Sequence, residues 1–216
     1  MKILLNKNNT ILFFTLLASL IFKLSLSTFL FPPVFEDAWE WPVINYNFKN
    51  DLIFSYFLID NLIDVKFSNY MPILYNIFLM PLLDVSHSFA MNFQIFLTVL
   101  TSLLFYLSAK TLYNFRVALI FLLIFSFFPL NVYSNIKFSN INLFLFFLSI
   151  LTLFFVKYLN DKNIYNLVII NIAACLCILA RSEFLLLYFF LFVYLIFLKK
   201  INLKYFLSSL IIFLIC

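Results

Sequence analysis

The feature that most constrains this chain is a series of apolar stretches, each about as long as a bilayer is thick, separated by polar turns. A helix needs about 20 mostly apolar residues to cross the hydrocarbon core, with a range near 17–25. The composition agrees, because 66% of the residues are hydrophobic and only 11% are charged, whereas roughly 25% are charged in an average soluble domain. The sequence therefore predicts an integral membrane protein.

The apolar stretches predict about six complete spans and the start of a seventh. The segment 164–198 is divided at Arg181-Ser182-Glu183, because as one helix it would be about 52 Å long, beyond a core of about 30 Å. The predicted spans are 11–31, 89–109, 117–134, 140–156, 164–180 and 184–198, and a last one begins at Tyr205 and is cut off at Cys216. We expect an all-α polytopic transmembrane helical bundle that forms a single domain over 1–216 and is incomplete at its C-terminus.

The basic residues predict the orientation of these spans, because cytoplasmic loops carry an excess of lysine and arginine. With the N-terminus inside, the cytoplasmic set is Lys2, Lys7, Lys110, Arg116, Lys157, Lys162, Lys199, Lys200 and Lys204. The outer set is only Lys49, Lys66, Lys137 and Arg181, and Lys23 lies within the first span. This places 34–88 outside the cell membrane as a long first extracytoplasmic loop, followed by the remaining spans in 89–216.

Several functions are excluded by what the sequence lacks. The chain contains no glycine, so the glycine-dependent phosphate loops of ATP and NAD enzymes cannot form, and we expect no cofactor. Three cysteines and one histidine, His87, make neither a disulfide framework nor a metal site, and we expect His87 to have a capping or interface role. The net charge is +5, but the 14 lysine and arginine residues are scattered between the apolar stretches and form no basic patch. We therefore expect no nucleic acid partner.

The long outer loop carries most of the candidate functional residues. Its segment 50–67 mixes acids and amides with large apolar residues, which suits a helix lying in the membrane interface. Its segment 71–83 contains Pro72 and Pro81 and is too short to span, so it is predicted to be a second interfacial or re-entrant helix.

Three carboxylates, Glu36, Asp37 and Glu40, lie within five residues at the start of this loop, beside Trp39 and Trp41. A partly desolvated carboxylate next to a membrane can act as a general base toward an acceptor hydroxyl. The alternative is that these are ordinary exposed acids and interfacial tryptophans of an outer loop.

The order of these features resembles the GT-C class of membrane glycosyltransferases, specifically its polyprenyl-phosphate-sugar-dependent, dolichyl-phosphate-mannose mannosyltransferase-like branch. One span precedes a long outer loop that opens with the acidic pair Glu36-Asp37, and the stretch Tyr70-Met71-Pro72-Ile73-Leu74-Tyr75 is similar to the family's Pro-Pro-Leu-Tyr region. Phe128-Pro129, with Ser134 and the turn 135–140 beyond it, looks like the family's third span and outer turn. The stretch 179–183 resembles the family's Arg-Pro-Glu turn, although Ser182 replaces the proline and Lys137 stands in the outer turn where an acid is frequent.

The resemblance implies a catalytic role for Asp37 or Glu36, and substrate binding by Arg181, Glu40, Tyr70 and Lys137. No metal ligand is assigned, because the cysteine and histidine content offers no metal site. An arginine at the outer end of a helix can hold a lipid-linked phosphate bidentately, but pairing with Glu183 or with lipid headgroups explains Arg181 equally well. A loop lysine at headgroup level also explains Lys137. Lys23 is a site hypothesis because it lies within a span, and its alternative is snorkelling along a tilted helix.

The expected function is hexosyl or pentosyl transfer from a polyprenyl-phosphate-linked sugar to an acceptor glycan, lipid or protein at the extracytoplasmic face. The alternatives are a non-enzymatic transporter or flippase, and an inert truncated product. The bias toward Phe, Asn, Ile and Lys suggests an AT-rich genome, so we expect a bacterial cytoplasmic membrane rather than the endoplasmic reticulum. Membrane lipid is the remaining expected partner.

Overall fold

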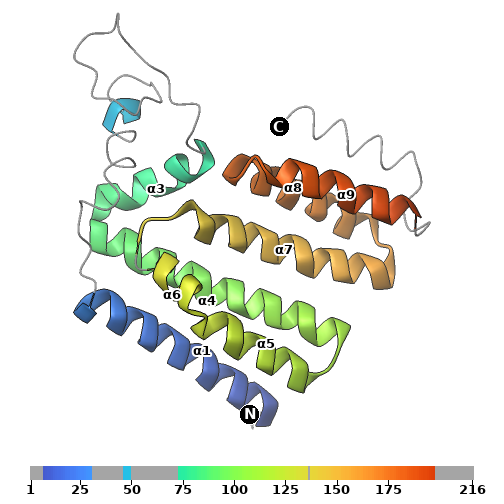
Figure 1. Cartoon of the computed structure of the whole chain (residues 1–216), viewed down its shortest axis with the longest axis horizontal. Coiled ribbons are helices and arrows are strands. Elements are labelled where there is room, and N and C mark those ends of the chain that lie inside the picture. The colour runs from blue at the N-terminus through green and yellow to red at the C-terminus, as the bar shows by residue number, and fades with distance from the viewer. Residues whose placement is uncertain (1–6, 31–45, 50–72, 136, 198–216) are drawn as a thin grey trace, which may run out of the picture.

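A computed structural model describes residues 7–30, 46–49, 73–135 and 137–197 of this chain, and this part contains helices and no strand (Figure 1). The elements in chain order are α1 (Lys7–Ser25), the π-helical turn η1 (Leu26–Leu30), α3 (Ile73–Val85), α4 (His87–Leu112), α5 (Phe115–Phe127), α6 (Pro129–Asn135), α7 (Asn140–Asp161), α8 (Ile164–Ala180) and α9 (Phe184–Phe197). The predicted all-α class is confirmed for these residues.

The long helices lie side by side with alternating direction (Figure 1). α7 packs between α4 and α8, α5 and α1 pack on the other side of α4, and α9 lies along α8. The α4–α5 and α7–α8 connections are at the same end of the bundle as the start of α1, while α3 and the α6–α7 connection are at the opposite end (Figure 1). We call the latter the outer end, following the orientation that the basic residues predict.

Three continuous helices are long and apolar enough to cross a membrane: Asn8–Phe29, His87–Leu112 and Asn140–Asp161. They correspond to the predicted spans 11–31, 89–109 and 140–156. The predicted spans 164–180 and 184–198 are helical as α8 and α9, but α8 has 17 residues and the described part of α9 has 14. The described residues therefore give three spans, or four if a bent pair counts as one, and the predicted total of six is not confirmed.

The predicted span 117–134 is helical but is not one continuous helix. The chain bends by 52° between α5 and α6, because Pro129 has no N–H to donate and forces the preceding residue out of the helical conformation. Phe128 accordingly has φ −62° and ψ 125°. The carbonyl of Phe125, which the proline deprives of its helical donor, accepts a hydrogen bond of 3.0 Å from the Asn131 side chain instead. The bend is thus built into the sequence at two positions.

The outer loop is described only in part. α3 lies where the second interfacial or re-entrant helix was predicted, and it packs on α4 and α8. Lys49 binds Asp84 at the end of α3 with an Nζ to Oδ1 distance of 2.8 Å, which ties the segment 46–49 to that helix. The predicted interfacial helix 50–67 and the acidic motif lie outside the described residues.

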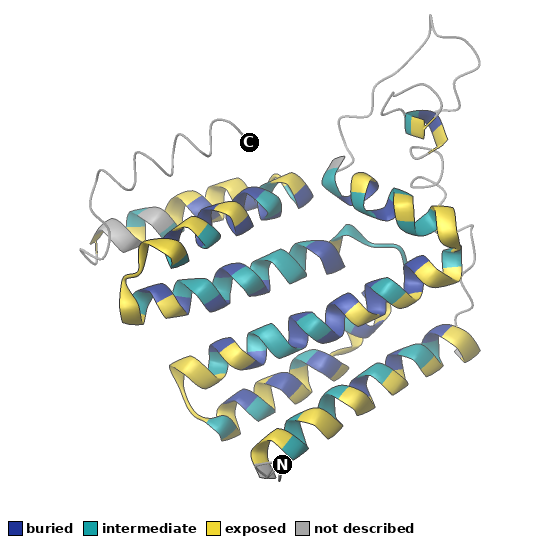
Figure 2. Cartoon of the chain, turned by 180° about the vertical axis from the view of Figure 1, so that it is seen from behind, coloured by how far each residue is buried: buried dark blue, intermediate teal, exposed yellow. Residues whose placement is uncertain are grey.

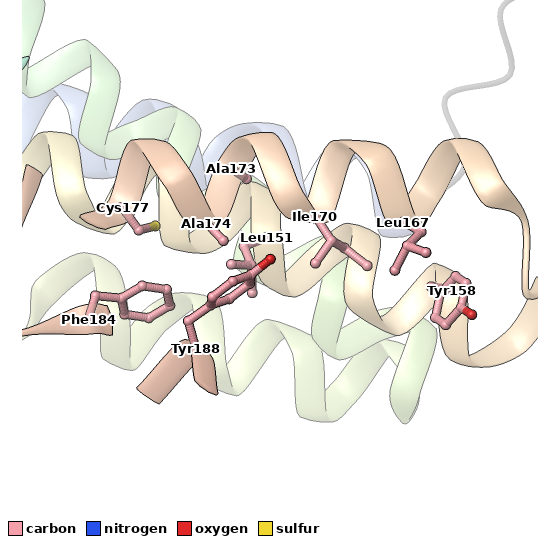
Figure 3. Close-up of a cluster of buried hydrophobic side chains, with 9 residues drawn as sticks. All are labelled: Leu151, Tyr158, Leu167, Ile170, Ala173, Ala174, Cys177, Phe184 and Tyr188. Atoms are coloured by element: carbon pink, nitrogen blue, oxygen red, sulfur yellow. The ribbon is translucent and has the colours of Figure 1, made fainter. Parts of the chain in front are cut away.

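The main cluster of buried apolar side chains joins α7, α8 and α9 (Figure 3). Small residues of α8, namely Ala173, Ala174 and Cys177, are buried against Leu151 of α7 and Tyr188 of α9 (Figure 3). Because helices in a bilayer associate through close van der Waals contact rather than through the hydrophobic effect, small residues allow the backbones to approach. Elsewhere the helices show alternating buried and exposed faces, as expected for packing on one side and lipid on the other (Figure 2).

Candidate substrate site at the outer end

The structure describes two of the six predicted site residues, Arg181 and Lys137. Glu36, Asp37, Glu40 and Tyr70 lie outside the described residues, so their roles stay predictions. Both described residues lie beside helix ends at the outer end of the bundle (Figure 1).

Arg181 ends α8 and lies at the outer end of the bundle. Its backbone N–H donates to the carbonyl of Cys177 at 2.8 Å, which caps the helix independently of the side chain. The guanidinium lies 3.6 Å from the Glu183 carboxylate and 5.9 Å from the centre of the Phe144 ring, and 41% of the side chain is exposed. A half-exposed arginine with one long contact to an exposed acid keeps donors available to an anionic ligand.

Lys137 lies in the short connection between α6 and α7, also at the outer end. Its ammonium is 5.1 Å from the centre of the Tyr133 ring, and its backbone carbonyl accepts a hydrogen bond of 2.6 Å from the Gln94 side chain. The lysine therefore belongs to a connection that is held in place rather than to a free loop. Both residues lie near the start of α7. Arg181 contacts the ring of Phe144 in the second turn of α7, and Lys137 lies in the connection that precedes Asn140, the first residue of α7.

Gln94 lies within α4, and its side chain forms hydrogen bonds to several elements at this end of the molecule. Its Oε1 accepts hydrogen bonds from the hydroxyl of Tyr75 at 2.8 Å and from the backbone N–H of Ser139 at 3.5 Å. Its Nε2 donates to the carbonyls of Ser134 at 3.2 Å and of Lys137 at 2.6 Å. One buried carboxamide thus joins α3, α4 and the α6–α7 connection. Burial raises the pKa of the Tyr75 hydroxyl, so this group stays protonated and remains a donor.

Asn142, in the first turn of α7, closes the same network. Its Nδ2 donates to the Ser134 carbonyl at 2.7 Å, and its Oδ1 accepts from the Ser134 hydroxyl at 3.0 Å. These bonds satisfy a carbonyl at the end of α6 that has no partner within its helix. Sequence reasoning singled out neither Gln94 nor Asn142. The available signal was an amide isolated within an apolar stretch, which is costly in a bilayer unless it is bonded.

Two further buried amides differ from these. Asn76 of α3 is 2% exposed and Asn135 at the end of α6 is 0% exposed, and within the described part of the chain neither amide atom of either residue has a hydrogen-bond partner. Each is the chain neighbour of a network member, Tyr75 and Ser134 respectively.

Lys23 lies deeper, on the face of α1 that packs against α4. It is 0% exposed, and its ammonium donates to the Thr98 hydroxyl oxygen at 3.3 Å, while Thr98 donates to its own helix at Ile95. The snorkelling alternative is therefore wrong, because the amino group is held between helices. Ser19 of α1 and Ser27 of η1, one turn to either side of Lys23, are buried as well, so α1 and η1 together present a polar stripe to their neighbours.

His87 is the first residue of α4, but Ser86 caps the helix through the N–H of Phe89. The His87 ring packs 6.3 Å from the Phe138 ring, which agrees with the interface role and not with the capping role. Among the described residues, no group of three His, Cys, Asp or Glu is placed to hold a metal ion.

A comparison with models of protein families matches residues 70–216 to the dolichyl-phosphate-mannose-protein mannosyltransferase family. The match covers more than half of the chain and includes α3 to α9, and the acidic motif precedes it. This chain belongs to that family, which is a family of membrane glycosyltransferases of the GT-C type. Neither the search of curated proteins nor the search of solved structures finds a match.

Proposed function

We propose that this protein transfers a sugar from a polyprenyl phosphate to an acceptor at the extracytoplasmic face of the membrane. Membership of the mannosyltransferase family carries the proposal, since it defines a membrane glycosyltransferase. The outer-end arrangement supports it, because Arg181, Lys137 and the Gln94 network lie at the same end of the bundle as the end of α1, which the predicted acidic loop follows in the sequence (Figure 1). A polyprenyl-phosphate donor brings its own leaving group, so the reaction needs no nucleotide in the outer compartment.

The proposed step is a single displacement. Asp37, or Glu36 beside it, takes the proton of the acceptor hydroxyl while that oxygen forms a bond to the anomeric carbon of the sugar. The bond between this carbon and the phosphate oxygen breaks, and the polyprenyl phosphate leaves with the bonding electrons. Arg181 holds the developing phosphate charge, and Lys137, Glu40 and Tyr70 contact the bound substrates.

The alternative of a transporter or flippase has less support. Transporters place paired charges or broken helices at mid-membrane depth around their substrate. Among the described residues, Lys23 is the one buried charged side chain, and its partner is a threonine rather than an acid. In the broken helix α5–α6, the Phe125 carbonyl that is freed at the bend is already hydrogen-bonded by the Asn131 side chain of the same helix pair. For the location we favour a bacterial cytoplasmic membrane over the endoplasmic reticulum, on composition.

The proposed function is tested with the purified full chain in lipid vesicles supplied with polyprenyl-phosphate mannose and an extract of envelope acceptors. We expect release of polyprenyl phosphate that depends on the protein and the acceptor extract. Substrate movement across the vesicle membrane without cleavage of the sugar-phosphate bond would instead support the transporter.

A further inference from the structure

The outer end contains buried amides of two kinds. Gln94 and Asn142 use both the oxygen and the nitrogen of their carboxamides in hydrogen bonds to other elements. Asn135 uses neither toward any of the described residues, although it is 0% exposed. The first two amides therefore hold described elements together, and the third does not.

An unbonded buried amide lowers stability. Desolvating a polar group without giving it a partner costs about 1–3 kcal/mol, whereas an apolar side chain of the same shape avoids this cost. Leucine has the same branching and the same number of side-chain heavy atoms as asparagine, and leucine is abundant in this chain. An asparagine at this position is thus explained by a polar partner that the described part of the chain does not supply.

The position of Asn135 indicates what kind of partner this is. The residue ends α6, two positions before Lys137, in a connection whose carbonyls are fixed by Gln94 and Asn142. Because the backbone is held by these bonds at Ser134 and at Lys137, on either side of Asn135, the Asn135 amide has a defined position. A ligand-binding group requires such a position. A carboxamide is neutral and offers both donors and an acceptor, which suits a neutral ligand rich in hydroxyl groups better than it suits a phosphate or a metal ion.

We propose that the side chain of Asn135 binds hydroxyl groups of the sugar carried by the lipid donor. This assignment rests on the proposed function for the identity of the ligand, and it makes Asn135 a determinant of sugar recognition. The bond geometry of the amide allows it to donate to one hydroxyl and accept from a neighbouring one.

The test compares Asn135→Leu with Asn142→Leu, which removes a fully bonded amide of the same end. We expect Asn135→Leu to keep or raise the melting temperature of the ligand-free protein, because an unbonded polar group is lost. The KM for polyprenyl-phosphate mannose should rise about 5- to 30-fold, as expected for the loss of one or two hydrogen bonds. Asn142→Leu should lower the melting temperature.

Ligand binding is measured separately from turnover by the thermal shift that polyprenyl-phosphate mannose gives beyond bare polyprenyl phosphate. This difference should be present in the wild type and lost in Asn135→Leu and in Asn135→Ala. An inactive wild type that still shows the difference would contradict the proposed function and support the inference. The inference is overturned if the wild type shows no difference or if the variants retain it. It is also overturned if Asn135→Leu lowers the melting temperature as much as Asn142→Leu, since the amide would then have a structural partner, either bound water or a part of the chain outside the described residues.

Discussion

The hydroxyl of Tyr75 donates a 2.8 Å hydrogen bond to the side-chain oxygen of Gln94, and this bond joins the helix that ends the outer loop to a membrane-spanning helix. Both side chains are almost completely buried. Because the nitrogen of the same carboxamide holds the carbonyls of Ser134 and Lys137, a change at Tyr75 reaches the α6–α7 connection as well.

Tyr75→Phe should therefore lower the stability of the protein. It removes one buried donor and keeps the ring, so we expect a loss of about 1 kcal/mol, measured by thermal unfolding in detergent or nanodiscs. Tyr165→Phe is the matched control, since Tyr165 is 74% exposed at the opposite end and should show no change. Equal effects of the two substitutions would mean that the Tyr75 to Gln94 bond contributes nothing.

Lys23→Met should keep or raise stability. The lysine is completely buried, and among the described residues its hydrogen-bond partner is the Thr98 hydroxyl, so a flexible apolar side chain of similar length relieves the desolvation of the amino group. Lys157→Met, at an exposed position of α7, controls for the loss of a positive charge. A melting temperature that falls by several degrees for Lys23→Met alone would show that the ammonium has an anionic partner.

The orientation is tested by labelling single cysteines in a background without the three native ones. Tyr46→Cys, in the described part of the outer loop, should react with an impermeant thiol reagent added to intact cells. Asp161→Cys, at the exposed end of α7, should react only after the membrane is permeabilised. The opposite pattern would contradict the entire site, because all proposed substrate residues share the side of Tyr46.

Arg181→Lys should weaken donor binding although the charge is unchanged, since lysine lacks the planar fork that matches a phosphate. Arg181→Ala should weaken it by about 10- to 150-fold, the range of a charge-assisted hydrogen bond. The helix cap is unaffected, because it uses the backbone of Arg181. Arg116→Lys, at the other end of the bundle, is the matched control. Unchanged donor affinity in Arg181→Ala would leave the pairing with Glu183 as the role of this arginine.

The sequence was sufficient to predict the long helices, because hydropathy over about 20 residues is a property of the segment alone. α1, α4 and α7 follow the predicted spans closely. The bend at Pro129 was missed because an average over the window 117–134 stays apolar across a proline, although the helix cannot continue there. α8 has 17 residues, which is the lower limit for a membrane span. At this length the mean hydropathy does not distinguish a spanning helix from a shorter buried one.

The candidate site was only partly predictable. Tyr75 and Ser134 lie in motifs that the sequence offers, but their partner Gln94 is 19 and 40 residues away along the chain. Which face of α4 meets α3 and the α6–α7 connection depends on how the helices pack, and this is not encoded in any local spacing. Asn142 is hydrogen-bonded, whereas Asn135 has no partner among the described residues, and this difference likewise arises only when the helices are in contact.

The most direct test of the account is the turnover of polyprenyl-phosphate mannose by Asp37→Asn, with Glu36→Gln and the double variant measured beside it. Asparagine keeps the shape of the aspartate and removes its basicity, so turnover should fall by about 10²- to 10⁴-fold while donor binding changes little. A loss of activity in Glu36→Gln with full activity in Asp37→Asn would move the base by one residue. Full activity in both single variants and in the double variant would contradict the proposal that a carboxylate of this outer motif accepts the acceptor's proton.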